Sequence, residues 1–347
     1  MATIIPSASR AARSAFGGAI GQSLALHYSQ SGSWIALQTE LSARAVSRTI
    51  NSCGQMNGAL SGRASCRSIA VADGKLGASD YWWDDIGNTS GQMILDFLAN
   101  VALLPQPLDF VIWNQGQADT NSLNGSNMSA AAAWTLHYDA VRNTIAAIRT
   151  ALSLPNLPFF LDMPPSSGIS RGRAYERLRQ CDLAVVRNTA NVFRGGEQYD
   201  LSRRDSTHLN HSGAREQGRR VGHLVAADVF GATSFYRGPS VASVTKISAT
   251  QTDVAITVEA GDTLVKPTDV PFHWRVESDT SYGTALAISA ISWSGNTARL
   301  THANCAGNPV FYPNYDDCLT YSATRWVGGT VSGMPLRSRD LGWTTAL

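Results

Sequence analysis

Ser23 and an Asp-x-x-His pair, Asp205 and His208, are the residues best suited to nucleophilic chemistry. Ser23 follows Gly21-Gln22 and precedes Leu24-Ala25-Leu26-His27-Tyr28, a segment that predicts a tight turn into a helix. A serine at such a turn exposes its hydroxyl, and the nearby backbone N–H groups lie at the positive end of the helix dipole. The alternative is that Gly-Gln-Ser is a plain loop with a helix cap.

Asp205 and His208 would supply the base that such a serine requires. A serine hydroxyl is a weak nucleophile until a base takes its proton, and an imidazole held by a carboxylate does this near neutral pH. Because Asp205 and His208 are three positions apart, one turn of chain sets the carboxylate against one ring nitrogen and leaves the other free. Two alternatives remain: a helix-capping Asp beside a surface His, or a metal site of Asp205, His208 and His211.

A third polar segment, Trp113-Asn114-Gln115-Gly116-Gln117-Ala118-Asp119, directly follows the apolar run 108–113. Polar side chains at the carboxyl end of a central parallel strand lie where open α/β sheets place their ligands. Amide side chains there would donate hydrogen bonds to a developing oxyanion. The segment is equally consistent with a turn whose side chains satisfy backbone groups.

A fourth segment, residues 72–85, follows the apolar run 69–72, which we interpret as a strand. A glycine at a strand end lets its backbone N–H approach a substrate oxygen, and Gly74 is preferred over Gly77 because it is closer to the strand. The paired Trp82 and Trp83 are either core residues or a wall on which a sugar would stack.

The segments around these residues are predicted to fold as an α/β domain, which would hold them in place. Short apolar runs at 69–72, 108–113 and 158–163 predict parallel strands. Between the last two, apolar residues at 141, 145, 148 and 152 predict a helix with Ser129 as its N-cap. Further helices are predicted around 93–101 and 221–229. We therefore assign residues 1–236 to an α/β domain.

After residue 237 the helical period disappears. The run 253–259 alternates apolar and polar residues like a half-buried strand, and similar runs follow at 272–276 and 285–291. Residues 237–347 are predicted to form an all-β module, a small β-sandwich. Cys305 and Cys318 would suit one local disulfide, although free thiols are the preferred interpretation of five unclustered cysteines.

The four segments, in this order, resemble the SGNH hydrolase superfamily, in particular its sialate O-acetylesterase and acetylxylan esterase branch. That branch carries Gly-Gln-Ser-Asn, a glycine block followed by a tryptophan, Trp-x-Gln-Gly-Glu-x-Asp, and Asp-x-x-His. The resemblance covers the first two thirds of the chain. This chain departs from the family pattern at two positions. Leu24 stands where the family has Asn, and Gln117 stands where the family has Glu. The change at Gln117 removes a carboxylate and affects the expected substrate preference.

The resemblance implies a three-layer α/β/α, flavodoxin-like fold and a role for each matching residue. Ser23 would be the nucleophile, His208 the general base and acid, and Asp205 the residue that orients the imidazole. The oxyanion hole would consist of the backbone N–H groups of Ser23 and Gly74 and the side-chain amide of Gln115. From the same blocks we expect Gln22, Trp82, Gln117 and Asp119 to contact the substrate.

The implied activity is hydrolysis of acetyl esters on a carbohydrate or polysaccharide through an acyl-enzyme, with no metal or organic cofactor. One alternative is a lipase or thioesterase for longer acyl chains, which would need an apolar tunnel. Another is a non-catalytic carbohydrate-binding protein or phage tail component, whose partner would be a virion or cell-surface assembly.

The amino-acid composition excludes several other classes of protein. The 347 residues are 44% hydrophobic and 16% charged, which is typical of a globular protein and not of a disordered one. A formal net charge of +2 lacks the dense basic footprint of a nucleic-acid-binding protein. No apolar stretch is long enough to span a membrane, and Arg10 and Arg13 interrupt the first 21 residues, so we expect a soluble chain without a signal peptide.

Overall fold

The computed structural model describes residues 13–44, 50–59, 62–75, 77, 80–165, 172–205, 207–233, 237–271, 273–279, 284–313 and 327–341. The helices within these residues are α1 (His27–Gln30), α2 (Ser33–Arg44), α3 (Arg67–Ala72), α4 (Gln92–Val101), the 3-10 helix η1 (Gln117–Asp119), α5 (Thr120–Leu123), α6 (Ala130–Ala151), α7 (Gly172–Asn188) and α8 (His211–Asp228). The strands of the α/β part are β1 (Arg13–Gly21), β2 (Ile50–Asn57), β3 (Ala64–Cys66), β4 (Tyr81–Asp84), β5 (Thr89–Ser90), β6 (Phe110–Asn114), β7 (Phe159–Met163) and β8 (Val192–Glu197).

The central sheet contains five parallel strands in the order β2-β1-β6-β7-β8. In chain order these strands occupy positions 2-1-3-4-5, which is the flavodoxin-like doubly wound arrangement. The chain reverses direction in the sheet between β1 and β6. At this switch point the carboxyl ends of neighbouring strands leave a crevice in which such folds bind ligands. The small sheet β3-β4-β5 lies beside it.

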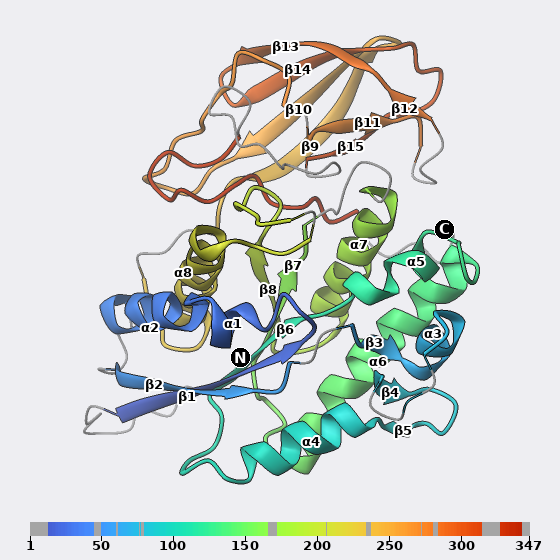
Figure 1. Cartoon of the computed structure of the whole chain (residues 1–347). Helices are drawn as coiled ribbons and strands as arrows, with labels where there is room; N and C mark the ends of the chain where they lie inside the picture. Colours follow the sequence, from blue (N-terminus) through green and yellow to red (C-terminus); the bar gives the residue numbers. More distant parts are fainter. Residues whose placement is uncertain are drawn as a thin grey trace.

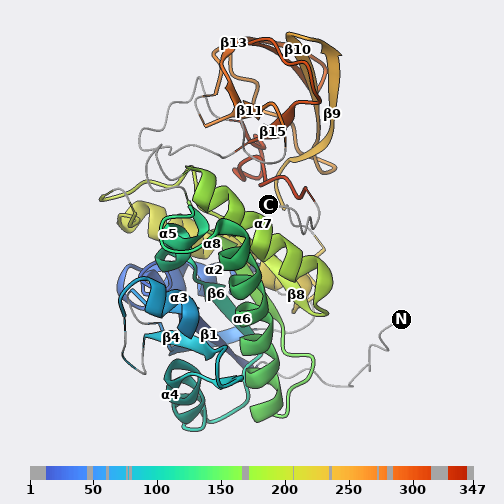
Figure 2. The same ribbon diagram turned by 90° about the vertical axis from the view of Figure 1, so that its right-hand side faces the viewer.

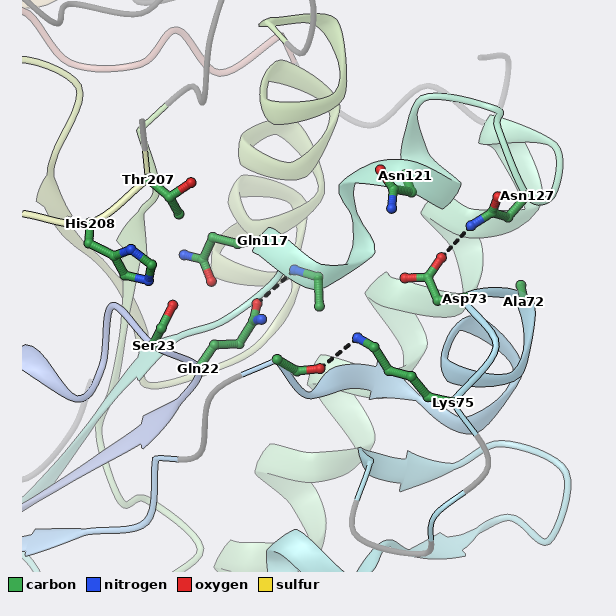
Figure 3. Close-up of a pocket in the computed structure, with 12 residues that line it drawn as sticks. Gln22, Ser23, Ala72, Asp73, Lys75, Gln117, Asn121, Asn127, Thr207 and His208 are labelled. Atoms are coloured by element: carbon green, nitrogen blue, oxygen red, sulfur yellow. Dashed lines mark hydrogen bonds between the residues drawn. The ribbon is translucent and has the colours of Figure 1, made fainter. Parts of the chain in front are cut away.

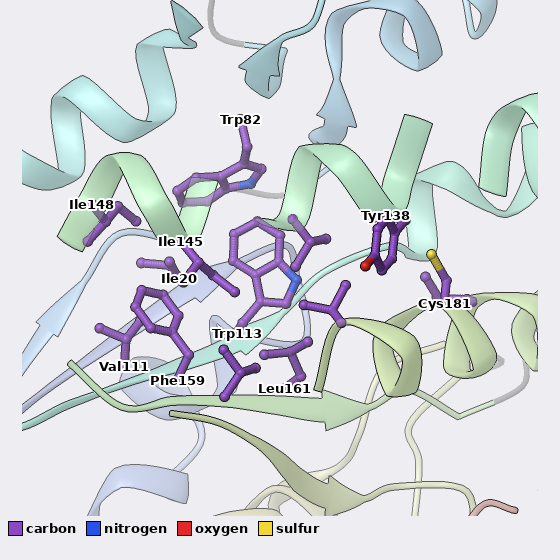
Figure 4. Packing of buried hydrophobic residues seen from close by; sticks show 14 of the residues in the cluster. Ile20, Trp82, Val111, Trp113, Tyr138, Ile145, Ile148, Phe159, Leu161 and Cys181 are labelled. Carbon is purple, nitrogen blue, oxygen red and sulfur yellow. The ribbon is translucent and has the colours of Figure 1, made fainter. Parts of the chain in front are cut away.

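Helices cover both faces of the sheet, which gives three layers (Figures 1 and 2). Strand β6 shows why: Phe110 and Ile112 join the cluster formed with α2 and α8, whereas Val111 and Trp113 join the cluster formed with α4, α6 and α7. Successive side chains of a strand point to opposite faces, so an uninterrupted apolar run buries both sides. Figure 4 shows Trp113 at the centre of the second cluster.

Most elements predicted in this part are confirmed. The predicted helix after Ser129 is α6, and the Ser129 hydroxyl accepts the N–H of Ala132 at 3.2 Å as an N-cap. The runs 108–113 and 158–163 become β6 and β7, and the helices near 93–101 and 221–229 become α4 and α8. The strand predicted at 69–72 is wrong, because these residues form the end of helix α3.

The C-terminal part contains only strands among its described elements. They are β9 (Ser240–Ser248), β10 (Gln251–Thr257), β11 (Arg275–Glu277), β12 (Ala285–Leu286), β13 (Ile288–Ser294), β14 (Thr297–His302) and β15 (Val310–Tyr312). They form two antiparallel sheets, β13-β14-β10-β9 and β12-β11-β15. Residues of both sheets, among them Val254, Val276 and Phe311, share one hydrophobic core. The predicted α/β/α domain with a C-terminal all-β module is thus confirmed as a fold class.

Two predictions about the C-terminal part are not tested by the structure. The first is the domain boundary after residue 236. The second is the state of Cys305 and Cys318: Cys305 is a buried free thiol, but Cys318 lies outside the described residues.

Candidate active site

Ser23 lies at the carboxyl end of β1, where the strand turns into α1. Gly21 ends the strand with φ 128°, and a Cβ there would lie 2.1 Å from the carbonyl oxygen of Asn114 on β6, so only glycine fits. In the turn that follows, the carbonyl of Gln22 accepts the N–H groups of Ala25 and Leu26. Ser23 stands at the start of this turn, and neither its N–H nor its hydroxyl has a hydrogen-bond partner among the described residues.

His208 and Asp205 lie in the loop between β8 and α8. The Nδ1 atom of His208 is 2.9 Å from Oδ2 and 3.0 Å from Oδ1 of Asp205. Desolvation acts to raise the pKa of Asp205, but hydrogen bonds from the N–H groups of His208 and Thr207 and from the imidazole outweigh it and lower the pKa to about 2. The carboxylate is therefore ionised over the whole range in which the imidazole works as a base.

Ser23 and His208 line the same cavity of about 500 Å³. Figure 3 shows the Ser23 hydroxyl directed at the imidazole. The structure therefore brings together three residues that are separated by up to 185 positions in the sequence. The arrangement is that of a hydroxyl, a base and an orienting carboxylate, which is suited to acyl transfer.

His27 stands behind His208, with ring centroids 6.4 Å apart in an edge-on arrangement. Burial, followed by the nearby His208 and Arg204, lowers the pKa of His27 to about 4. The ring of His27 is thus neutral at pH 7. A neutral neighbour adds no repulsion when His208 takes up a proton during the reaction.

Gln22 and Gln117, for which we expect substrate contacts, both line the cavity. The side-chain oxygen of Gln22 accepts the N–H groups of Gly116 at 3.1 Å and Ala118 at 2.9 Å, which joins the Ser23 turn to the loop after β6. The amide of Gln117 donates to Asn114 Oδ1 at 3.1 Å. An amide group carries two donor hydrogens, so the second one of Gln117 stays available.

The buried carboxylate of Asp162 is joined to Gln117 of this wall through Asn114. It accepts hydrogen bonds from Gly196 N (2.9 Å), Gln217 Nε2 (2.9 Å), Tyr28 Oη (3.0 Å) and Asn114 Nδ2 (3.2 Å). Burial raises its pKa to about 6, although these donors act to lower it. The network fixes Asn114 and, through it, Gln117.

Two predicted site residues that follow β6, Gln115 and Asp119, do not line the cavity. Gln115 is fully buried and its amide donates to the carbonyl of Arg63 at 2.6 Å, so the structure turns it away from the cavity. Asp119 is also fully buried; it accepts the N–H of Ser65 and contacts His137 Nδ1 at 2.6 Å. Asp119 therefore has a structural role and not the predicted substrate contact.

Trp82 is likewise a core residue. It is completely buried on β4 and packs edge-on against Trp113 with ring centroids 5.3 Å apart (Figure 4). It belongs to the large apolar cluster under α4 and α6. The prediction that Trp82 contacts the substrate is wrong, and the alternative that it is core is correct.

Gly74 is not a free donor. Its N–H is bonded to the carbonyl of Val71 at 2.9 Å, because Gly74 closes the end of helix α3 and does not follow a strand. The competing Gly77 donates its N–H to Asp80 at 2.8 Å. Gly62 lines the cavity instead, in the connection between β2 and β3.

Sequence reasoning missed the far side of the cavity. There Asp73, Lys75, Asn121 and Asn127 line the wall opposite His208 (Figure 3). Asn127 donates its amide to Asp73 Oδ1, and Lys75 Nζ donates to the carbonyl of Gly62 at 2.6 Å. Asp73 and Lys75 flank Gly74 in the segment 72–85, but nothing in the sequence indicates the two asparagines.

The described residues contain no group of three or more His, Cys, Asp or Glu side chains arranged to hold a metal ion. His211 lies at the start of α8 and lines a different cavity from His208. Among the described helices, none is long and apolar enough to cross a membrane.

Sequence comparison identifies no relatives, since no family model and no curated protein matches the chain. Among solved structures, the chain is similar to a carbohydrate acetylesterase from Xanthomonas citri, with a TM-score of 0.59 and 14% identity over 88% of this chain. The α/β fold is shared. The match covers 64% of that protein, so the chain spans less than two thirds of its length.

Two further structures have lower scores. A protein from Arabidopsis thaliana has a TM-score of 0.40 and 16% identity over 56% of this chain and 68% of that one. A carbohydrate esterase family 3 protein from Talaromyces cellulolyticus has a TM-score of 0.34 and 15% identity over 61% of this chain and 94% of that one.

Proposed function

We propose that the chain is a serine esterase that removes O-acetyl groups from a carbohydrate. The observation that carries this proposal is the Ser23 hydroxyl directed at an imidazole whose other nitrogen contacts Asp205. The fold shared with a carbohydrate acetylesterase supports the same class of reaction. Fold alone does not imply function, so the proposal depends on the site.

In this mechanism the Ser23 oxygen attacks the acetyl carbonyl carbon while His208 Nε2 takes the hydroxyl proton. The tetrahedral intermediate collapses, the bond to the sugar oxygen breaks, and His208 returns the proton to that oxygen. A water molecule then attacks the acetyl-serine with His208 again as base. Acetate leaves, and Ser23 recovers its proton. Asp205 keeps the imidazole oriented and stabilises its charged form.

The oxyanion needs preorganised donors. We assign this role to the N–H of Ser23, which has no partner among the described residues, and to the second amide hydrogen of Gln117. The N–H of Gly62, at the cavity wall, takes the place that the sequence suggested for Gly74. Each such donor typically contributes about 3–4 kcal/mol to transition-state stabilisation.

The wall of the cavity favours a sugar over a long acyl chain. Of its 12 lining residues, only Ala72, Ala118 and Gly62 lack a polar side chain. A fatty acyl chain requires an apolar tunnel, because burying its methylene groups against unpaired polar groups is unfavourable. Carboxylate and amide groups such as Asp73 and Asn127 instead match the hydroxyls of a sugar.

The test is acetate release from acetylated xylan, sialylated glycans and bacterial capsular polysaccharides, by wild type, Ser23→Ala and the matched control Ser29→Ala. We expect the wild type and the control to release acetate from at least one of them, and Ser23→Ala to lose about 10⁴-fold or more in turnover. On p-nitrophenyl esters, acetate should be preferred over a long chain. Equal activity of Ser23→Ala and wild type would remove the proposed nucleophile, and a long-chain preference would favour a lipase.

A further inference from the structure

Four arginines surround a small cavity away from the candidate active site. Arg194 on β8, Arg220 on α8, Arg237 and Arg337 line it together with Glu197. Its volume is about 20 Å³. The cavity lies where the C-terminal segment 334–341 returns to the α/β part, and both parts contribute to its wall.

The C-terminal segment is held there by polar contacts. Ser338 donates its N–H and its hydroxyl to the two carboxylate oxygens of Glu197, both at 2.8 Å. Tyr199 donates its hydroxyl to the carbonyl of Leu336 at 2.8 Å. Arg194 donates to the carbonyl of Ser338 at 2.7 Å. The cavity is therefore part of a specific junction.

Three of the four arginines have carboxylate partners. Arg220 binds both oxygens of Asp200 at 2.7 Å and also contacts Glu216. Arg237 makes a two-point contact with Asp228. Arg194 lies 3.7 Å from Glu197. Glu259 lies nearby as well, but its carboxylate accepts the backbone N–H groups of Arg237 at 2.6 Å and Gly238 at 3.2 Å.

Arg337 is the exception. Its Nε atom is buried and has no hydrogen-bond partner among the described residues, and no described carboxylate forms an ion pair with its guanidinium. Burial and the like charges of Arg194 and Arg237 lower its pKa to about 10, although Glu259 and Glu197 act in the opposite direction. One positive charge at the junction is left without a direct counter-charge.

We propose that this cavity binds one small monovalent inorganic anion, with chloride as its physiological form. The volume allows a single water-sized occupant, since a site needs roughly 10–15 Å³ to hold one water molecule. A tetrahedral oxyanion is too large. A water molecule would satisfy the Nε hydrogen bond but would bring no negative charge to a wall that carries four guanidinium groups, one of them without an ion pair among the described residues.

Anion binding would stabilise the attachment of the C-terminal segment, because a ligand that binds only the folded state raises its stability. The test is thermal unfolding in a chloride titration at constant ionic strength, balanced with gluconate, which is too large for the cavity. We expect Tm to rise by about 3 °C and then saturate. Arg337→Gln should remove the rise.

Arg339→Gln is the matched control, because Arg339 lies in the same segment but does not line the cavity. It should keep the chloride effect. Crystals of the wild type grown in bromide provide a second measurement that does not depend on a variant folding: an anomalous peak is expected beside Arg337 Nε. A cavity that holds only water, or an equal chloride effect in Arg337→Gln, would overturn the proposal.

Discussion

His208 Nδ1 lies 2.9 Å from Oδ2 of Asp205, and the same carboxylate also accepts the N–H groups of Thr207 and His208 at 2.8 and 2.7 Å. The backbone N–H groups of the loop thereby hold the carboxylate in place, and the carboxylate in turn orients the imidazole ring. Its pKa of about 2 lies below the ordinary 3.8, so the ionised form is the one that the fold stabilises. This contribution to stability is present above about pH 4 and is lost as the pH falls through 2.

Replacing Asp205 by Asn should reduce turnover without unfolding the protein. An amide fits the same space and keeps one acceptor, but it does not stabilise the charged imidazole, and it permits the wrong tautomer. We expect kcat to fall by about 10³–10⁴-fold with little change in KM, measured on p-nitrophenyl acetate. Asp253→Asn, at a carboxylate on β10 that pairs with Arg299 away from the cavity, is the control and should keep full activity. Unchanged kcat in Asp205→Asn would exclude Asp205 from the proposed triad.

The polar wall around Asp73 and Asn127 should act on polysaccharide substrates only. A small ester occupies the space between Ser23 and His208, whereas a sugar chain extends along the cavity. Loss of one hydrogen bond of about 1.4 kcal/mol should raise KM for the acetylated polysaccharide about tenfold in Asp73→Ala or Asn127→Ala. The value of kcat/KM for p-nitrophenyl acetate is the internal control and should stay unchanged. A parallel loss on both substrates would indicate a structural effect.

For Trp82, in contrast to Asp73 and Asn127, we expect a substitution to affect stability and not the KM for the polysaccharide. Because it is fully buried against Trp113, Trp82→Ala should destabilise the protein by about 3–5 kcal/mol in chemical denaturation. Trp82→Phe keeps an aromatic ring in the core and should cost less while leaving KM for the polysaccharide unchanged. A rise in KM for the folded Trp82→Phe variant would restore the sugar-stacking role that the sequence had suggested.

The centre of the sheet could be predicted because β6 and β7 are mainly apolar runs. Both strands bury both faces, and their polar residues are Asn114, at the end of β6, and Asp162, whose carboxylate accepts four hydrogen bonds. β1 has no such run. Gly17 and Gly18 interrupt it, and the reason lies elsewhere in the chain, since a Cβ on Gly17 would lie 2.4 Å from the ring of Phe110. The glycines of this strand are required by a tertiary contact, so the strand cannot be recognised from its own sequence pattern.

The short run 69–72 shows a second limit. Four apolar residues fit a buried strand or one side of a short helix, and length alone does not separate the two. The choice of Gly74 depended on the strand interpretation and failed with it. Ser23, Asp205 and His208 could be proposed from the sequence because such chemistry is specific to residue type and spacing, and their roles stay a prediction. Asn121 and Asn127 were not, because only the fold brings them to the cavity.

The buried His137 supplies a prediction on pH and stability. It lies between two carboxylates, with Nδ1 2.6 Å from Asp119 and Nε2 3.2 Å from Asp182. Desolvation acts to lower its pKa, but the two carboxylates outweigh it and raise the pKa to about 10. The charged imidazole thus joins α6 and α7 to η1, the short helix that also carries Gln117.

Because the folded pKa lies above the ordinary 6.5, the stabilisation from His137 is complete below pH 6.5 and is lost as the pH rises through 10. His137→Leu leaves two buried carboxylates without their cation, and we expect a loss of about 3–5 kcal/mol in urea denaturation at pH 6. That loss should shrink toward pH 10 as the wild type gives up its proton. The control is Arg187→Gln, at the surface pair with Asp340, which should change stability by no more than about 1 kcal/mol. A His137→Leu effect that is independent of pH would mean that the imidazole is neutral and contributes by packing alone.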